Sequence, residues 1–263
     1  MIEFKRVTKS FDNEDVLRDV SFRIHRGETK IILGESGSGK STILKLILGL
    51  IRPESGEIRI EGRDITKLEE SELVAIRRNI GMVFQEGALF DSLSVRENVG
   101  YRLYEEGGLE EEAIESQVRE QLGFVGLDEA IEKMPAELSG GMKRRVGIAR
   151  ALVGSPKIVL YDEPTAGLDP ITKRTIVELM IKLRDMEGVT SVFVTHDLPA
   201  ATMMATEYAF AAKDGKIDYH SGEDSAGVTN VNCIMLQEGS ICFEGSYDAL
   251  IRSELPYIRK FTA

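Results

Sequence analysis

The stretch IILGESGSGKSTILKLILGL, residues 31–50, decides the fold of this 263-residue chain. It contains the pattern G-x-x-x-x-G-K-[ST], placed between a short apolar run and a segment with helical periodicity. Glycines let backbone N–H groups turn inward around phosphate oxygens, and the following helix N-terminus adds the positive end of its dipole. Lys40 supplies a charge for the β- and γ-phosphates of a nucleotide, and the Ser41 hydroxyl suits Mg²⁺. The predicted nucleotide-binding residues of this loop are Gly34, Glu35, Ser36, Gly37, Ser38, Gly39, Lys40, Ser41 and Thr42.

Length and composition are those of a globular protein with a sizeable interior. The chain is 42% hydrophobic and 29% charged. Its net charge of −11 argues against a nucleic-acid-binding surface. The two cysteines, Cys233 and Cys242, suit a reducing cytoplasm better than a disulfide scaffold. The strongest apolar stretch, 43–51, is half as long as a membrane span, and the N-terminus lacks the apolar region of a secretory signal. Work at a membrane would therefore require a partner.

Four segments have the pattern of a parallel sheet. Each has a continuous apolar run that ends in a polar residue or glycine, which is typical of strands covered on both faces: TKIILGE (29–35), NIGMVFQ (79–85), KIVLYDE (157–163) and TSVFVTH (190–196). In such sheets ligands collect beyond the carboxyl ends of the strands. The ends of these four segments are therefore expected to face one crevice: Gly34, Gln85, Asp162 with Glu163, and His196.

Adjacent carboxylates follow the third of these strands. Two buried negative charges are costly unless a cation or a protonated partner meets them. With a Mg-nucleotide in the crevice, Asp162 would hold the metal through its bound water, and Glu163 would orient and polarise the water that attacks the γ-phosphate. The alternative is an ordinary strand whose polar end reaches solvent.

The remaining segments differ from the parallel pattern. VSFRIH (20–25) and GEIRIEG (56–62) alternate apolar and polar residues, which predicts a small antiparallel layer beside the core. Residues 88–156 have a helical pattern, and the acidic run within 105–120 indicates a solvated helix face.

Two hairpin-like units, 209–219 and 233–243, follow near the C-terminus, each with a central acid–glycine pair. A turn at 238–239 would pair position 235 with 242 and position 233 with 244. The two cysteines would then not face each other.

A second glycine-rich stretch reduces the number of nucleotide-binding families that the sequence fits. In LSGGMKRRVGIARAL (138–152), Ser139, Gly140 and Gly141 open a helical pattern and form a further anion-binding helix N-terminus. Taken alone this would be a helix cap without a ligand. Together with the loop 34–42, Gln85, the DEP run and His196 in this order, the chain resembles the ATP-binding cassette (ABC) ATPase family. The resemblance covers about 1–213 and again about 233 to the end.

The resemblance implies a fold and its divisions. The fold is an α/β P-loop NTPase with a RecA-like parallel sheet, an N-terminal antiparallel β layer and a helical subdomain that bears the signature motif. Within a single domain, 1–87 and 157–263 would form the nucleotide-binding core and 88–156 the helical subdomain. Family members have one strand–turn–strand unit after the histidine, whereas this chain has two. Residues 214–245 are therefore expected to be a hairpin insertion within the core.

The resemblance also implies roles for individual residues. Glu163 matches the hydrolytic base, Asp162 and Ser41 the metal ligands, and Gln85 the residue that contacts Mg²⁺ and the water. His196 matches the switch histidine that senses the γ-phosphate.

Further positions concern the adenine ring and the dimer. Phe11 sits where an aromatic ring stacks on adenine, although a lone phenylalanine can equally be a core residue. Ser139, Gly140 and Gly141 match the signature, and Asp169 belongs to the D-loop, AGLDP (166–170). Two copies of such a cassette pair head to tail, with the signature of each closing over the ATP bound by the other.

One branch of the family fits best. GALFDSLSVRENV (87–99), DEPTAGLDPIT (162–172), LSGGMKRR and the ending LPYIRKFTA resemble the Mla-type (maintenance of lipid asymmetry) phospholipid transport ATPases. That resemblance implies an integral membrane permease that docks near Leu89 and Phe90, lipid-binding accessory proteins, and a cytoplasmic location on the inner face of the membrane. The alternatives are another ABC importer or exporter, or a soluble ABC ATPase of DNA repair or translation.

Overall fold

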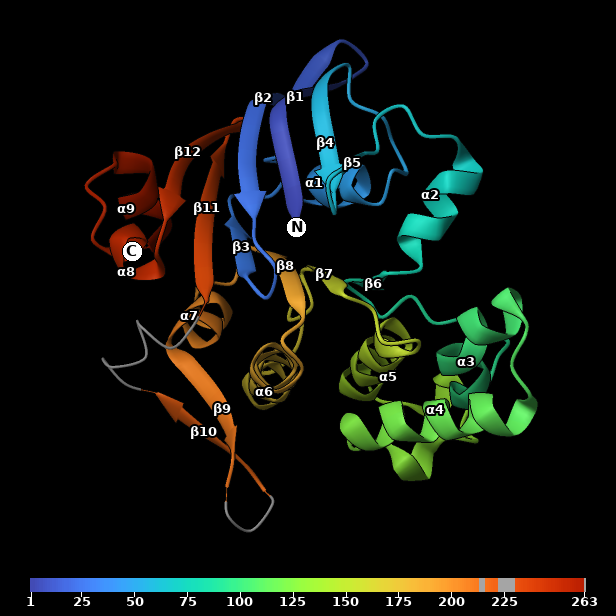
Figure 1. Cartoon of the computed structure of the whole chain (residues 1–263). Helices are drawn as coiled ribbons and strands as arrows, with labels where there is room; N and C mark the ends of the chain where they lie inside the picture. Colours follow the sequence, from blue (N-terminus) through green and yellow to red (C-terminus); the bar gives the residue numbers. More distant parts are fainter. Residues whose placement is uncertain (213–215, 222–229, 263) are drawn as a thin grey trace.

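The core of the protein is a six-stranded sheet whose strand order is β12-β11-β3-β8-β7-β6 in the computed structural model, which describes residues 1–212, 216–221 and 230–262 (Figure 1). The strands are β3 (Thr29–Leu33), β6 (Ile80–Val83), β7 (Ile158–Asp162), β8 (Thr190–Thr195), β11 (Val231–Gln237) and β12 (Ser240–Gly245). All neighbours except β11 and β12 run parallel, which confirms the four predicted strands. Their carboxyl ends therefore lie along one edge of the sheet.

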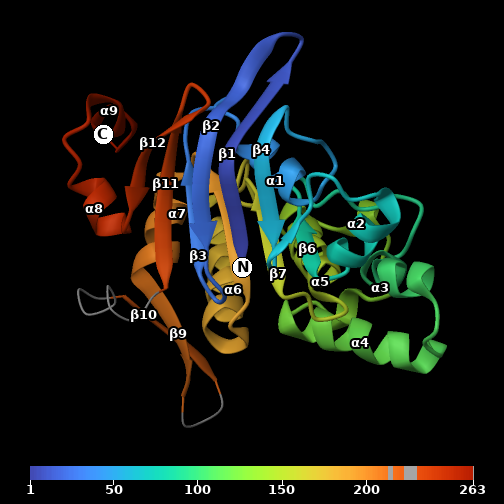
Figure 2. The ribbon, with the colours of Figure 1, turned by 45° about the horizontal axis from the view of Figure 1, so that its top comes forward.

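The predicted antiparallel layer is confirmed as a second sheet of order β2-β1-β4-β5. It contains β1 (Ile2–Phe11), β2 (Glu14–Ile24), β4 (Ser55–Ile60) and β5 (Arg63–Asp64). Buried side chains of this sheet and of α1 (Lys40–Ile47) form one apolar cluster with Ile32, Leu160 and Val194 of the core sheet. Helix α1 is thus enclosed between the two sheets (Figure 2).

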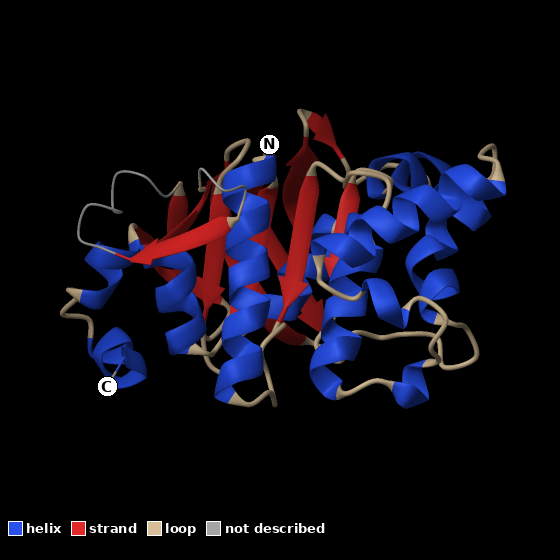
Figure 3. Cartoon of the chain, turned by 90° about the horizontal axis from the view of Figure 1, so that it is seen from below, coloured by secondary structure: helices blue, strands red, loops and turns tan. Residues whose placement is uncertain are grey.

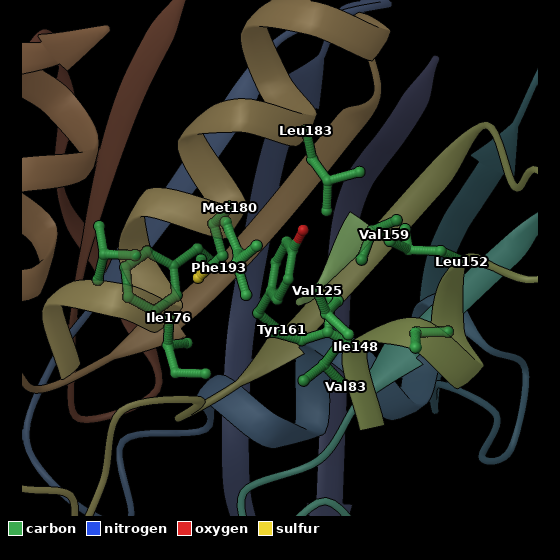
Figure 4. Packing of buried hydrophobic residues seen from close by; sticks show 14 of the residues in the cluster. Val83, Val125, Ile148, Leu152, Val159, Tyr161, Ile176, Met180, Leu183 and Phe193 are labelled. Carbon is green, nitrogen blue, oxygen red and sulfur yellow. The ribbon is translucent and has the colours of Figure 1, made fainter. Parts of the chain in front are cut away.

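Helices cover the opposite face of the core sheet, as the view from below shows (Figure 3). They are α5 (Gly140–Leu152), α6 (Pro170–Glu187) and α7 (Leu198–Thr206). Because side chains alternate along a strand, Val159 and Tyr161 of β7 face these helices, whereas Leu160 faces α1. Tyr161 packs among Ile176, Met180 and Phe193 in this part of the core (Figure 4).

The segment predicted to be helical contains α3 (Val95–Glu106), α4 (Glu111–Phe124), the 3₁₀ turns η1 (Asp128–Ala130) and η2 (Pro135–Glu137), and α5. A shorter helix, α2 (Glu70–Arg77), precedes it. In α4, Ile114 and Val118 point into the core while Glu111 and Glu112 are exposed, so the acidic run is a solvated helix face. In the part of the chain that the structure describes, no helix is long and apolar enough to cross a membrane.

The range expected to be a single hairpin insertion, 214–245, divides between two sheets. Strand β9 (Glu207–Ala211) pairs with β10 (Ile217–Ser221) in a separate two-stranded sheet that projects from the core (Figures 1 and 2). Strands β11 and β12 instead join the core sheet beside β3. The predicted turn at Asp214–Gly215 and most of the polar stretch 220–230 lie outside the described residues. Helices α8 (Tyr247–Ile251) and α9 (Pro256–Thr262) complete the fold.

The predicted register of β11 and β12 is wrong by one residue. The turn lies at Glu238 and Gly239, as expected, and both have positive φ, of 48° and 80°. However, Met235 pairs with Phe243, and Cys233 pairs with Gly245. A β-bulge after Met235 inserts one extra residue in β12, which no apolar pattern announces. Both cysteines are free.

Candidate active site

The glycine-rich loop 34–39 connects β3 to α1, which begins at Lys40. Two glycines are required here by close packing. A Cβ at Gly34 would lie 2.8 Å from the Leu236 carbonyl oxygen, and one at Gly39 would lie 2.9 Å from that of Val16, with φ at +101°. Lys40 is buried, and its Nζ donates to the carbonyls of Gly34 at 2.9 Å and Glu35 at 3.0 Å. The ammonium group therefore lies inside the loop.

The two adjacent carboxylates have different surroundings. Asp162 Oδ1 accepts a hydrogen bond from the Ser41 hydroxyl at 2.8 Å, which joins the end of β7 to the start of α1. Burial raises the pKa of Asp162, and the neighbouring charge of Glu163 raises it further, against the effect of the Ser41 hydrogen bond. Glu163 Oε1 instead lies 3.6 Å from Lys40 Nζ. Burial lowers the pKa of Lys40, and the charge of Glu163 opposes that shift.

Glu163 is held by the end of β8. Its N–H donates to the Val194 carbonyl at 3.0 Å, and its φ of 48° is in the left-handed region that a glutamate rarely adopts. One carboxylate oxygen accepts from the Thr195 hydroxyl at 3.2 Å and from the His196 N–H at 3.3 Å. The other lies 2.9 Å from His196 Nδ1. A strained backbone and three contacts thus fix this carboxylate, as is common at functional sites.

A cavity of about 390 Å³ brings most of the predicted residues together. Its lining includes the loop, two β-layer residues and the ends of the neighbouring core strands: Phe11, Val16, Ser36, Gly37, Gly39, Lys40, Ser41, Thr42, Gln85, Glu163 and His196. Phe11 is exposed rather than part of the core, and Lys9 Nζ lies 4.9 Å from its ring centroid. The crevice expected at the carboxyl ends of the strands is therefore present.

The signature and D-loop residues do not line this cavity. Ser139 caps α5 by accepting a hydrogen bond from the Met142 N–H at 3.3 Å. Asp169 caps α6 by accepting from the N–H groups of Ile171 and Thr172, both at 3.1 Å. A Cβ at Gly141 would lie 2.6 Å from the Thr172 side chain, so the two helix N-termini are neighbours. Gly140, by contrast, faces open space.

Sequence reasoning missed two arginines that tie α5 to the site. Arg144 donates to the carbonyls of Pro164 and Ala166, at 2.9 and 2.8 Å, just after Glu163. Arg150 donates to the carbonyls of Gly87 and Ala88, both at 2.7 Å, just after Gln85. The basic residues within 143–150 can be recognised in the sequence. Their partners cannot be predicted from it, because they are backbone carbonyls, which every residue has. It also missed Thr195, the polar residue that directly precedes His196.

A separate groove of about 310 Å³ lies where α3, α5 and β6 meet, and its lining includes Phe84, Phe90 and Tyr101. All three side chains are exposed, and the rings of Phe90 and Tyr101 are 4.7 Å apart. The fully buried Asn98 holds the loop before α3 by donating to the carbonyls of Phe90, Leu93 and Ser94. Leu89, where a partner is expected to dock, is partly buried and packs against the protein's own core.

Comparison with known proteins agrees with a nucleotide site at the cavity that the glycine-rich loop lines. The family model described as ABC transporter matches residues 17–166. The chain is 40% identical to the chloroplastic protein TRIGALACTOSYLDIACYLGLYCEROL 3 of Arabidopsis thaliana, over 96% of this chain and 76% of that protein. It is 39% identical to the intermembrane phospholipid transport system ATP-binding protein MlaF of Escherichia coli strain K12, over 84% and 81%.

The chain is also similar to an import protein for another substrate and to a solved cassette dimer. The methionine import ATP-binding protein MetN of Carboxydothermus hydrogenoformans is 45% identical over 78% of this chain, which spans 59% of that relative's length. Among solved structures, a dimeric post-hydrolysis state of the cassette MJ0796 bound to ADP and Pi has a TM-score of 0.77 at 33% identity, covering 94% of this chain and 98% of that one.

Proposed function

Because this chain belongs to the ABC transporter family and is an ATPase, we propose that it uses ATP to drive a membrane permease whose cargo is phospholipid. The observation that supports the chemistry best is the position of Glu163, with Lys40 on one side and His196 on the other in the cavity that the glycine-rich loop lines. The phospholipid cargo is supported by the similarity to MlaF over most of both chains.

ATP binding is assigned to the residues of the cavity. The N–H groups of the loop 34–42 would surround the phosphates, and Lys40 would turn from the carbonyls of Gly34 and Glu35 to the β- and γ-phosphates. The exposed ring of Phe11, which lines the same cavity, would stack on adenine.

The oxygen atoms near the loop fit a magnesium ion. Mg²⁺ prefers hard oxygen ligands and binds through one or two carboxylates plus phosphates. Ser41 and Asp162 already lie in hydrogen-bond contact, and Gln85 lines the same cavity. Ser41, Gln85 and Asp162 would hold the ion, which would neutralise phosphate charge when bound.

Hydrolysis is assigned to Glu163, with His196 and Gln85. The Glu163 carboxylate would accept a proton from water as the water oxygen attacks the γ-phosphorus. The bond from that phosphorus to the bridging oxygen breaks, and ADP leaves with the electron pair. Thr195 and the His196 N–H hold one carboxylate oxygen in place, so the base is already oriented. His196 and Gln85 would contact the γ-phosphate and the water.

A dimer is proposed because the signature and D-loop residues do not line the nucleotide cavity of their own chain. Ser139, Gly140, Gly141 and Asp169 lie at helix N-termini outside their own cavity, so a second copy arranged head to tail would bring them to the phosphates. The permease would dock in the groove beside Phe90, and this would hold the protein on the cytoplasmic face of the membrane. Lipid-binding accessory proteins would complete the transporter, and nucleic acid is not expected to be a partner.

The test is reconstitution with the membrane protein that co-purifies with the chain. In liposomes, the complex should transfer a fluorescent phospholipid in an ATP-dependent manner, and Glu163→Gln should abolish the transfer. Methionine uptake by the same liposomes tests the second candidate, which the similarity to MetN favours. Methionine uptake without phospholipid transfer would overturn the proposed cargo, and a chain that co-purifies with no membrane protein would overturn the proposed partner.

A further inference from the structure

A tyrosine of the last helix contacts the phosphate loop. Tyr257 lies in α9, which is anchored by the fully buried Ile258. Figures 1 and 2 show α9 beside β12, far along the chain from the loop that follows β3. Nevertheless, the Glu35 N–H donates to the Tyr257 hydroxyl oxygen at 3.4 Å. The same hydroxyl donates to the carbonyl of Leu236, near the end of β11, at 3.2 Å.

The hydroxyl is suited to this place because it can donate and accept at once. Strand β11 approaches the loop so closely that the Leu236 carbonyl leaves no room for a side chain at Gly34. Tyr257 therefore bridges two backbone segments that already touch. Three positions later, and so on the same side of α9, Lys260 Nζ lies 3.7 Å from the Glu35 carboxylate. That pair is exposed and contributes little by itself.

Residues 34 and 35 are thus held from two sides. On the inside, Lys40 binds the carbonyls of Gly34 and Glu35. On the outside, Tyr257 binds the Glu35 N–H. If Lys40 turns to the phosphates when nucleotide binds, the inner contacts are lost and the outer one remains. The outer hydrogen bond would then keep the first turn of the loop in the shape that directs the following N–H groups at the phosphates.

We propose that Tyr257 is a positioning residue for the nucleotide site, acting through the Glu35 N–H, and that α9 thereby sets the affinity of the loop for nucleotide. The inference rests on the proposed assignment of residues 34–42 as the phosphate-binding loop. It assigns no chemical step to Tyr257. Its effect should therefore be seen in the binding of nucleotide rather than in the rate of turnover.

The test compares two tyrosine-to-phenylalanine variants of the full chain. Tyr257→Phe removes the bridging hydroxyl and keeps the ring. Tyr247→Phe is the matched control, because Tyr247 is half-buried in the neighbouring α8 and its hydroxyl lies 2.5 Å from that of Thr202 in α7, away from the loop. Binding of ADP is measured by isothermal titration calorimetry with Mg²⁺ present, and kcat and KM for ATP are measured alongside.

Loss of one net hydrogen bond predicts a rise of about threefold to tenfold in Kd for ADP and in KM for Tyr257→Phe, with kcat within about twofold of the original. Tyr247→Phe should leave Kd and KM unchanged. An unchanged Kd for Tyr257→Phe, or an equal loss in both variants, would overturn the inference. Thermal unfolding of both variants shows whether each is folded. If Tyr257→Phe does not fold, amide hydrogen exchange of the original chain with ADP bound is the test: the Glu35 N–H should stay protected, and free exchange of that N–H would overturn the inference. Failure of the unaltered chain to bind ADP would instead overturn the proposed function.

Discussion

The imidazole Nδ1 of His196 lies 2.9 Å from the Oε1 of Glu163, the same carboxylate oxygen that lies 3.6 Å from Lys40 Nζ. One oxygen of the proposed base is thus shared by two groups that follow adjacent parallel strands, Lys40 in the first turn of α1 after β3 and His196 after β8. Both groups are also assigned to the γ-phosphate. Arrival of the phosphate would withdraw them from Glu163 and leave its carboxylate free for water, so binding of nucleotide would be coupled to activation of the proposed base.

Glu163→Gln should stop turnover while retaining ATP binding. The amide keeps the size of the side chain but cannot accept the proton of water, so kcat should fall about a hundredfold or more. Phosphate release measures the loss, and size-exclusion chromatography with ATP should show a larger dimer fraction. The exposed Glu129 offers a control, since Glu129→Gln should hydrolyse ATP normally. A Glu163→Gln protein with normal turnover would refute the assignment of the base.

Many of the residues that line the candidate site were predicted from the sequence. The loop 34–42, Gln85, Glu163 and His196 each end an apolar run, and a parallel sheet must bring such ends to one edge. What the sequence hid are contacts made to backbone atoms. Arg150 and Tyr257 bind carbonyl or N–H groups, which every residue has, so no pattern marks their partners.

The C-terminal strands show a second limit. The two hairpin-like units have similar patterns, yet β9 and β10 form their own sheet while β11 and β12 extend the core. The choice depends on which strand reaches the free edge of β3, a long-range contact that a local pattern does not encode. The bulge after Met235 is a local feature, but no pattern of residue types predicts it.

Arg144→Ala should destabilise the fold. The nearly buried guanidinium donates to the carbonyls of Pro164 and Ala166, and its removal leaves both without these donors. The expected loss in free energy of unfolding is about 2–3 kcal/mol, measured by urea denaturation. Arg144→Lys should recover little, because an ammonium cannot reproduce the planar fork. The exposed Arg252 gives the control: Arg252→Ala should stay within about 0.5 kcal/mol of the original.

Asp162→Asn should stabilise the nucleotide-free protein near neutral pH. Burial raises the pKa of Asp162, so between its ordinary value and its raised value the folded state binds more protons than the unfolded state. Stability from this group is therefore full below the ordinary value and is lost as pH rises through the raised one. Asparagine cannot ionise, so the Tm advantage of the variant should be largest at neutral pH and shrink toward pH 4.

Thermal unfolding across pH measures this difference, with the exposed Asp218 changed to asparagine as the control. The same Asp162→Asn variant should lose ATPase activity, because the proposed metal ligand is gone. A variant that is less stable than the original protein at pH 7 would show that the ionised carboxylate is not a cost to the nucleotide-free fold.

Phe90→Ala should uncouple the ATPase from its permease. Phe90 is exposed in the groove between α3 and β6, its ring lies 4.7 Å from that of Tyr101, and Arg150 sits over its face at 5.9 Å. An aromatic side chain in such a groove is a typical anchor for a partner helix, so its removal should cut permease binding about tenfold or more. The ATPase rate of the isolated chain should remain unchanged, because Phe90 does not line the nucleotide cavity.

Phe210→Ala is the matched control, since that ring is similarly exposed on the distant β9. Pull-down with the purified permease and its stimulation of ATP hydrolysis measure both effects, and equal stimulation of the two variants would place the docking site elsewhere.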